Sequence, residues 1–170
     1  MTKLTEYERQ NLINQFRLID ALNDSNENEN AIKALIGGFE GSYNEEVFKE
    51  LERTISTQVF VFVKDVLKMH EVGIQSYKNL DDNQKSEDLE HKVMFKGFDA
   101  NTQYDCYRCV QYILDDLGLY ETVKKSTSSY NTHSSSKKIK DYTLQIAKFE
   151  ECEIERNNFL TKEQLEHIFK

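Results

Sequence analysis

Apolar residues recur along most of this chain at steps of three and four positions, which is the period of an amphipathic α-helix. Close to the N-terminus, such a face comprises Leu12, Phe16 and Ile19. Before it stands Thr5-x-x-Glu8, a capping box in which the Thr hydroxyl and the Glu carboxylate bind the backbone N–H groups that open a helix. The pattern therefore predicts a helix here, and the polar run at 23–30 predicts the loop after it.

Residues 31–79 carry the pattern of a short helix followed by two longer ones. The short helix is expected from about Ala31 to Gly37-Gly38, because glycine accepts the left-handed conformation that ends many helices. Ser42-x-x-Glu45 has the spacing of a second capping box. From Phe48 onward the apolar positions are again helical in spacing: 48, 51, 55, 59, 62, 66 and 69.

One stretch of this region has two interpretations. Gln58–Val63 is rich in β-branched and aromatic residues, a composition that is also typical of a strand. We prefer two helices in near-continuation, with a break around 54–57, because the Ser and Thr residues there can cap a new helix. The second of these helices is expected to reach about Asn79.

The following segment predicts two further helices and a polar loop. Ser86 can cap a short helix that carries Leu89 and Val93. Asp99 occupies an N-cap position before a helix whose apolar face comprises Cys106, Val110, Ile113 and Leu117. Gly118 is expected to stop that helix. Residues 126–136 are almost entirely Ser, Thr, Asn and His, and we expect them to be too polar to pack.

The C-terminal region predicts two more amphipathic helices. The first carries Ile139, Tyr142, Ile146 and Phe149, and the second opens with the capping box Thr161-x-x-Gln164. Together these elements predict an all-α fold, a bundle of about seven to eight helices. We expect one or two helical subdomains, with long helices in 1–80 and a Ser-rich basic loop at 124–140 within 81–170. The absence of proline from all 170 residues suits helices that end at glycine or polar runs.

Composition bears on where the protein acts. The longest aliphatic and aromatic run is Val59–Val63, which is too short to span a bilayer, so no membrane is expected. Met1–Gln10 lacks the apolar region of a signal peptide. Three cysteines, an odd number, indicate reduced thiols. We therefore expect a cytoplasmic protein.

Two short motifs suggest metal or redox chemistry, and both are better explained by structure. Cys106-x-x-Cys109 lacks the second pair of ligands that a zinc site needs, and it falls on the apolar stripe of its helix. Asp88-x-x-His91 is one incomplete half of a di-iron pattern, so we read it as a solvated helix face. No metal is expected.

His70 is the candidate general base, because it lies beside the apolar positions of the long helix. Spacing alone assigns it no nucleophile, and a partly buried, hydrogen-bonded imidazole is the simpler interpretation. The cluster Gly37-Gly38-Phe39-Glu40-Gly41 lacks the Lys or hydroxyl of a phosphate-binding loop. We expect no cofactor and no catalytic residues.

Charge is unevenly distributed along the chain. The net charge is −8, yet the segment 124–148 holds six lysines against Asp141. This basic island flanks the Ser-rich loop and predicts contacts with a phosphate, a nucleic-acid backbone or an acidic partner surface. The candidate binding residues are Lys124, Lys125, His133, Lys137, Lys138 and Lys140, together with His70. A solubilising loop is the alternative.

Several segments resemble the YfbU-like family of bacterial proteins. Phe95-Lys96-Gly97-Phe98-Asp99-Ala100 is similar to that family's F-x-G-F-D-A stretch, and the aromatic-rich helix from Tyr104 to Tyr112 follows it in the same way. Asn14-Gln15-Phe16, Met69-His70, Tyr77-x-Asn79-Leu80 and the closing helix also fit. The Ser-rich loop departs from the family pattern. The resemblance implies an all-α fold and brings no reaction or catalytic residue.

These observations favour a regulatory protein-interaction module over an enzyme. Nine Tyr and ten Phe on amphipathic helices suit a protein partner, and we expect a homo-oligomer. Two alternatives stay open. One is a ligand- or phosphate-binding enzyme that uses His70 or the basic island. The other is a weak, salt-dependent nucleic-acid contact through 124–140.

Overall fold

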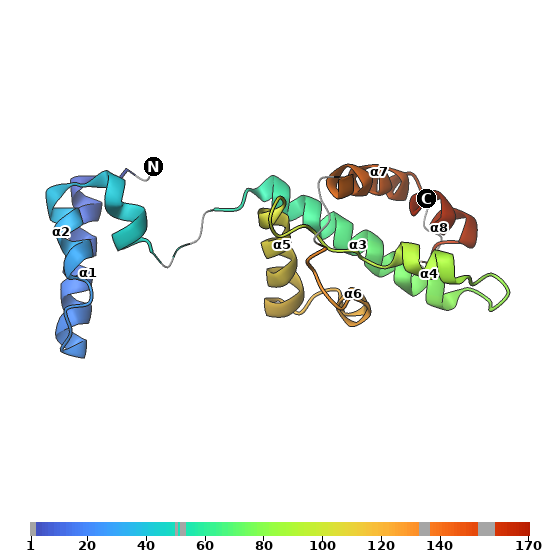
Figure 1. Cartoon of the computed structure of the whole chain (residues 1–170), viewed down its shortest axis with the longest axis horizontal. Helices are drawn as coiled ribbons and strands as arrows, with labels where there is room; N and C mark the ends of the chain where they lie inside the picture. The colour runs from blue at the N-terminus through green and yellow to red at the C-terminus, as the bar shows by residue number, and fades with distance from the viewer. Residues whose placement is uncertain (1–2, 50, 52–53, 133–136, 153–158) are drawn as a thin grey trace. The chain divides into compact units, whose positions relative to one another are not determined.

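The computed structural model describes residues 3–49, 51, 54–132, 137–152 and 159–170 (Figure 1). Its regular secondary structure is helical, apart from a single parallel bridge between Phe98 and Asn131 in the described chain. The all-α prediction is therefore confirmed. The chain divides into two compact units, Met1–Thr54 and Ile55–Lys170. The boundary that we expected after residue 80 lies inside the second unit, at the end of its longest helix.

Unit 1 is built on two helices, α1 (Glu6–Asn23) and α2 (Glu29–Gly37). The capping box of α1 is confirmed, since the Glu8 backbone N–H donates to Thr5 Oγ1 at 3.2 Å and the Thr5 N–H donates to Glu8 Oε2 at 2.8 Å. Gly38 ends α2 in the left-handed conformation, with φ of 68°. The small core of this unit consists of Ile13, Ala34, Leu35 and Tyr43.

The segment after α2 departs from the predicted pattern. Ser42 does not cap a helix; its hydroxyl instead donates to the Phe39 carbonyl at 2.9 Å. A 3-10 turn (Glu40–Ser42) and a π-helical turn (Tyr43–Val47) follow. Burial of the Tyr43 ring, which is 1 % exposed, holds the chain in this tight turn. The helix expected from Phe48 is absent from the described residues up to α3.

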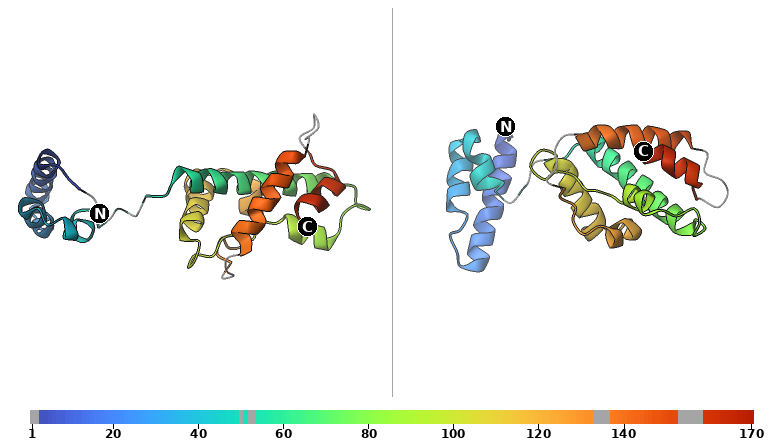
Figure 2. Two further views of the ribbon diagram at one scale, coloured as in Figure 1. Left: turned by 90° about the horizontal axis from the view of Figure 1, so that it is seen from above. Right: turned by 45° about the vertical axis from the view of Figure 1, so that its right-hand side comes forward.

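Unit 2 is organised around α3 (Thr57–Asn79). Its other helices are α4 (Glu87–Val93), α5 (Tyr104–Gln111), α6 (Glu121–Ser126), α7 (Lys137–Glu151) and α8 (Lys162–Ile168), and each of them packs against α3 (Figures 1 and 2). Ser56 caps α3 by accepting from the Val59 N–H at 3.3 Å. The helical interpretation of Gln58–Val63 is thus confirmed over the strand.

Asp99 does not begin α5, contrary to the sequence prediction. Its carboxylate accepts from the Asn101 N–H at 2.8 Å in a turn, and α5 starts later, at Tyr104. A π-helical turn (Tyr112–Asp116) then extends α5 to its stop at Gly118, where φ is 64°. The Asp99 carboxylate thus binds the Asn101 N–H in a turn, and the helix begins only after this turn.

The polar loop was expected not to pack, and its described part does pack. The Phe98 N–H donates to the Tyr130 carbonyl at 2.9 Å, and the Thr132 N–H donates to the Phe98 carbonyl at 3.2 Å. Gly97 makes this close approach possible: its φ is +78°, and a Cβ there would lie 2.2 Å from the Tyr130 oxygen. The Gly97-Phe98-Asp99 stretch, the most specific part of the family resemblance, therefore has a structural role: it fixes the segment around Tyr130 against the rest of unit 2.

The C-terminal capping box is confirmed by the Gln164 N–H, which donates to Thr161 Oγ1 at 3.3 Å, and by the Thr161 N–H, which donates to Gln164 Oε1 at 2.8 Å. None of the described helices combines the length and the apolar character that crossing a bilayer requires.

Candidate interaction surfaces

His70 lies in the core of unit 2, on α3. Its side chain is 1 % exposed, and its Nδ1 is 2.7 Å from the Val93 carbonyl, so Nδ1 carries the proton and donates it. The rings of Phe95, Tyr142 and Phe169 surround the imidazole at centroid distances of 5.5, 5.5 and 5.2 Å. Burial lowers the pKa of His70 to about 4. The imidazole is therefore neutral and enclosed, and this geometry suits packing rather than contact with a substrate.

The cysteines of the C-x-x-C motif are core residues as well. Cys106 and Cys109 are buried on the inner face of α5. Burial raises the pKa of the Cys106 thiol to about 11 and also raises that of Cys109, so neither is a ready thiolate. Among the residues that the structure describes, no group of three or more His, Cys, Asp or Glu could hold a metal ion.

Asp88 and His91 lie on the exposed face of α4. Asp88 pairs with Lys92 at 2.6 Å, and His91 Nε2 is 3.8 Å from Glu87 Oε1. Asp88 and Lys92 also line a polar hollow of about 420 Å³ between α4 and α8, together with Glu163, Glu166, His167 and Lys170. Charges of both signs alternate there, as on an ordinary solvated surface.

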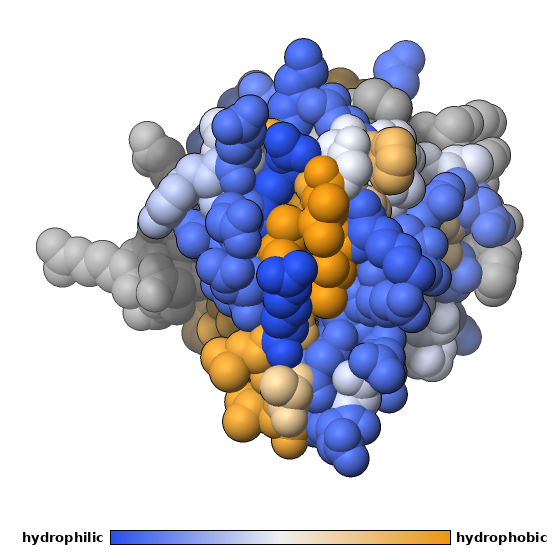
Figure 3. All heavy atoms as spheres, turned by 90° about the vertical axis from the view of Figure 1, so that its left-hand side faces the viewer, coloured by the Kyte–Doolittle hydropathy of each residue, from blue (hydrophilic) through white to orange (hydrophobic). Residues whose placement is uncertain are grey.

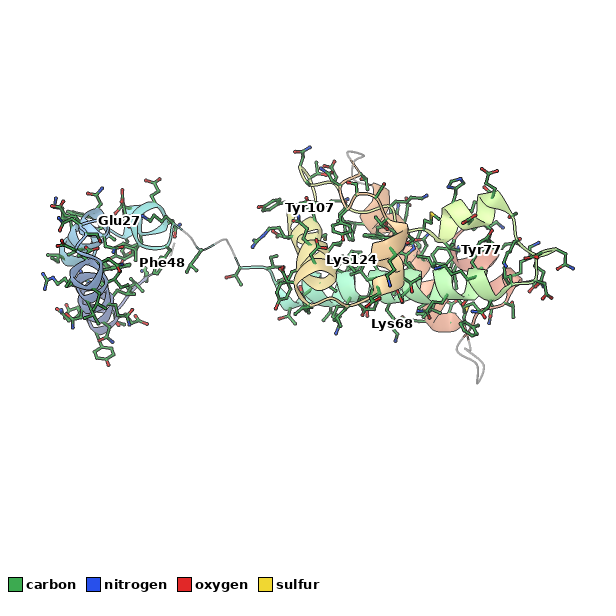
Figure 4. The ribbon with its side chains drawn as sticks, turned by 90° about the horizontal axis from the view of Figure 1, so that it is seen from below. Glu27, Phe48, Lys68, Tyr77, Tyr107 and Lys124 are labelled. Carbon is green, nitrogen blue, oxygen red and sulfur yellow. The ribbon has the colours of Figure 1, made fainter. Side chains whose placement is uncertain are left out.

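The lysines of the basic island occupy different elements. Lys124 and Lys125 lie on α6, where Figure 4 labels Lys124. Lys124 pairs with Asp115 at 2.8 Å and Lys125 with Glu121 at 2.6 Å, which offsets their charge. Lys140 is exposed near the start of α7. Lys137 and Lys138 belong to the first turn of α7, and His133 lies outside the described residues. The structure thus does not gather the described lysines into one cationic site.

An apolar stripe, interrupted by the polar residues Asn11 and Gln15, lies on the outer face of α1. Tyr7, Leu18 and Leu22 are 76, 61 and 76 % exposed. Leu18 follows Tyr7 by about three helical turns and Leu22 by one more, so all three share a face. The buried Ile13 lies on the other side of the helix. Exposed apolar side chains also gather in a strip on the face of unit 1 that Figure 3 presents.

The predicted apolar face of Leu12, Phe16 and Ile19 is only partly buried. Leu12 and Phe16 pack against the core of unit 1, whereas Ile19 is 45 % exposed. The pattern did contain the signal for the outer stripe, because Leu18 and Leu22 are one turn apart.

A second apolar surface is a groove on unit 2, between α3 and α7. It has a volume of about 420 Å³, and its lining comes from Gln58, Val61, Phe62 and Asp65 on α3 and from Thr143 and Ile146 on α7. Val61 is 49 % exposed, and Phe62 forms the floor by packing on Phe98 at a ring distance of 6.2 Å. The helical spacing included Phe62 in the apolar face, but sequence reasoning did not recognise that Val61 would be exposed beside it.

The comparisons with known proteins agree with the fold. Residues 2–170 match the model of the YfbU domain. The chain is also 29 % identical over 137 residues to the UPF0304 protein MJECS11 of Methanocaldococcus jannaschii, a similarity that covers 76 % of this chain and 79 % of that protein. The resemblance in the F-x-G-F-D-A stretch thus extends over nearly the full length. This chain belongs to the YfbU family.

Proposed function

We propose that this protein is a regulatory protein-interaction module of the cytoplasm that self-associates through the outer face of α1. The stripe of Tyr7, Leu18 and Leu22 is the observation that carries this proposal. Exposed apolar side chains at helical spacing, opposite the face that packs on the core, are typical of a helix that docks on another protein surface.

The remaining candidate residues add support by their placement. His70, Cys106 and Cys109 are core residues, and Lys124 and Lys125 are paired with carboxylates. These five side chains are therefore engaged in the fold itself. Free thiols at Cys106, Cys109 and Cys152 suit a reducing compartment.

Sedimentation velocity over a range of protein concentrations tests the proposal. We expect the wild type to sediment as a dimer or a larger assembly. The double variant Leu18→Gln/Leu22→Gln removes apolar contact area without touching the core, so it is expected to sediment as a monomer.

Leu117→Gln/Leu144→Gln is the matched control, because both side chains are exposed leucines of unit 2, at 44 and 56 %. This control should keep the mass of the wild type. A wild type that is monomeric at every concentration, or a Leu18/Leu22 variant that assembles normally, would refute self-association through α1.

A further inference from the structure

The ring of Phe169 packs directly beside the imidazole of His70. Phe169 is 2 % exposed, and its ring centroid lies 5.2 Å from that of His70. Gly73, one turn after His70 on α3, makes room for the ring, because a Cβ on Gly73 would lie 2.7 Å from two of its carbons. Val93 lines the same space, with its Cβ 3.8 Å from that position. The Phe169 ring therefore fills a space that α3 leaves open next to His70.

Of the three rings around His70, that of Phe169 is held by the fewest interactions. Phe95, Phe98 and Tyr142 contact one another at ring distances of 5.4 to 6.0 Å, and the Tyr142 hydroxyl donates to the Gly97 carbonyl at 3.3 Å. Phe169 follows the last residue of α8, and its ring contact within the described chain is with His70 alone. A change at His70 thus acts first on the Phe169 ring.

The hydrogen bonding of His70 suits the neutral imidazole. Nδ1 donates to the Val93 carbonyl at 2.7 Å, and Nε2 is buried with no hydrogen-bond partner among the described residues. An imidazolium carries a second N–H, on Nε2, and a charged donor without an acceptor is costly to bury. Protonation of His70 therefore requires water or another acceptor at Nε2.

The groups that surround His70 do not balance a positive charge. From α7 it meets Tyr142, whose hydroxyl is neutral because burial raises its pKa. Lys96, after α4, is a cation that disfavours the imidazolium. Glu71, the next residue on α3, is turned toward α6, where its carboxylate accepts from backbone N–H groups. The charged side chains of α4 and His167 of α8 are exposed.

We propose that the Phe169 ring shields His70 from water in a pH-dependent way: protonation of His70 releases the ring from the space beside Gly73 and admits water to the imidazole. The helix α8 stays in place, because Leu165 and Ile168 anchor it with side chains that are 0 % exposed. A fall in pH is thereby converted into the exposure of one aromatic side chain, which is a local conformational change rather than unfolding.

Fluorine NMR of the full chain tests the proposal, with 4-fluorophenylalanine incorporated at position 169 or, in a second sample, at position 98. As the pH is lowered from 7 to 4, we expect the resonance of position 169 to move to its solvent-exposed value. The midpoint should lie between the pKa of His70 in the core, about 4, and its ordinary value of 6.5. The resonance of position 98 and the circular dichroism at 222 nm should stay unchanged through this step.

Two substitutions identify the group that titrates. His70→Phe removes the imidazole, so the resonance of position 169 should no longer respond between pH 7 and 4. His167→Gln is the matched control, because His167 lies two residues before Phe169 but is exposed, and this variant should respond as the wild type does.

Gly73→Ala should produce the released state without acid. The added Cβ occupies the space of the ring, so at pH 7 the resonance of position 169 is expected at its exposed value. Water then reaches His70, and an NMR titration of its imidazole should show a pKa raised from about 4 toward 6.5. Gly41→Ala is the control, since the space around Gly41 is open, and it should leave both quantities at their wild-type values.

Three results would overturn the proposal. If positions 169 and 98 and the circular dichroism all change at one pH, acid unfolds unit 2 cooperatively and no local release exists. If His70 titrates while position 169 keeps its buried resonance, the core accommodates the imidazolium. If Gly73→Ala leaves the pKa of His70 at about 4, the Phe169 ring is not what keeps water away from it.

Discussion

At the residue scale, the family motif is explained by one backbone conformation. Gly97 holds a positive φ against the Tyr130 carbonyl, and this contact lets Phe98 enter the core with 0 % exposure. Glycine is required there for two separate reasons, the left-handed backbone and the space that a Cβ would take.

Alanine substitutions at three glycines distinguish the effect of the left-handed backbone from the effect of the steric clash. Gly97→Ala combines an unfavourable φ with a clash, so we expect a loss of unfolding free energy above about 2 kcal/mol. Gly118→Ala has the positive φ but open space, and should cost about 1 kcal/mol. Gly41→Ala has neither problem and should be nearly neutral. Urea unfolding of the three variants gives the order, and equal effects at Gly97 and Gly118 would contradict the clash.

His70 makes stability depend on pH. Its pKa is about 4 in the folded protein, against an ordinary value of 6.5, because burial disfavours the imidazolium and the nearby Lys96 adds to this effect. As the pH falls, His70 is therefore protonated at a higher pH in the unfolded chain than in the folded protein. Full stability holds above pH 6.5, and up to about 3 kcal/mol is lost between pH 6.5 and 4.

Urea unfolding between pH 7 and pH 4 measures this loss, and His70→Phe should flatten the decline whatever its effect on stability at pH 7. His91→Gln is the control, because His91 is exposed on α4 and should leave the decline unchanged. A His70→Phe protein with the same pH dependence as the wild type would contradict the role of burial.

At the element scale, local signals were predictable from the sequence. The capping boxes at Thr5 and Thr161 and the helix end at Gly38 depend on residues within four positions, so they are visible in the pattern. Asp99 has the same N-cap chemistry, but the chain turns there because Phe98 pairs with residues 130–132. No local pattern encodes such a distant partner.

Thr161 offers a test of the capping of α8. Thr161→Ala removes the oxygen that accepts from the Gln164 N–H, and a lost N-cap costs about 1 kcal/mol. Because Leu165 and Ile168 of α8 are fully buried, we expect the loss to lower the stability of unit 2 as a whole. Thr161→Ser keeps the hydroxyl and should retain most of the stability in thermal unfolding. An Ala variant as stable as wild type would show that packing alone holds α8.

At the scale of the whole molecule, the unit boundary could not be predicted from the sequence. Apolar residues recur at helical spacing on both sides of the boundary between Thr54 and Ile55. The two units differ in the core that these apolar residues join, and the sequence pattern does not show this. The candidate residues differ in the same way. The preference for a buried, hydrogen-bonded His70 came from its place beside the apolar positions of the helix and agrees with the structure, whereas the exposure of Val61 depends on packing that the pattern does not show.

Independent folding of the units is the prediction at this scale. A fragment of residues 55–170 contains the whole larger core and should unfold in urea as one cooperative transition. A fragment of residues 1–54 contains only the small core around Ile13, Leu35 and Tyr43 and is close to the size at which a single core is marginal, so it should show a weak, broad transition. A cooperative and stable fragment 1–54 would contradict this.

The central position of α3 has a consequence for synthesis. The rings that enclose His70 include Phe169, about a hundred residues later in the chain. At 5–20 residues per second, roughly five to twenty seconds pass between the two during translation. Throughout that time, the apolar face of α3 (Val63, Val66, Leu67 and Met69) lacks its last partners. Nascent chains of this protein therefore present chaperones with a long apolar helix well before the core that will cover it is complete.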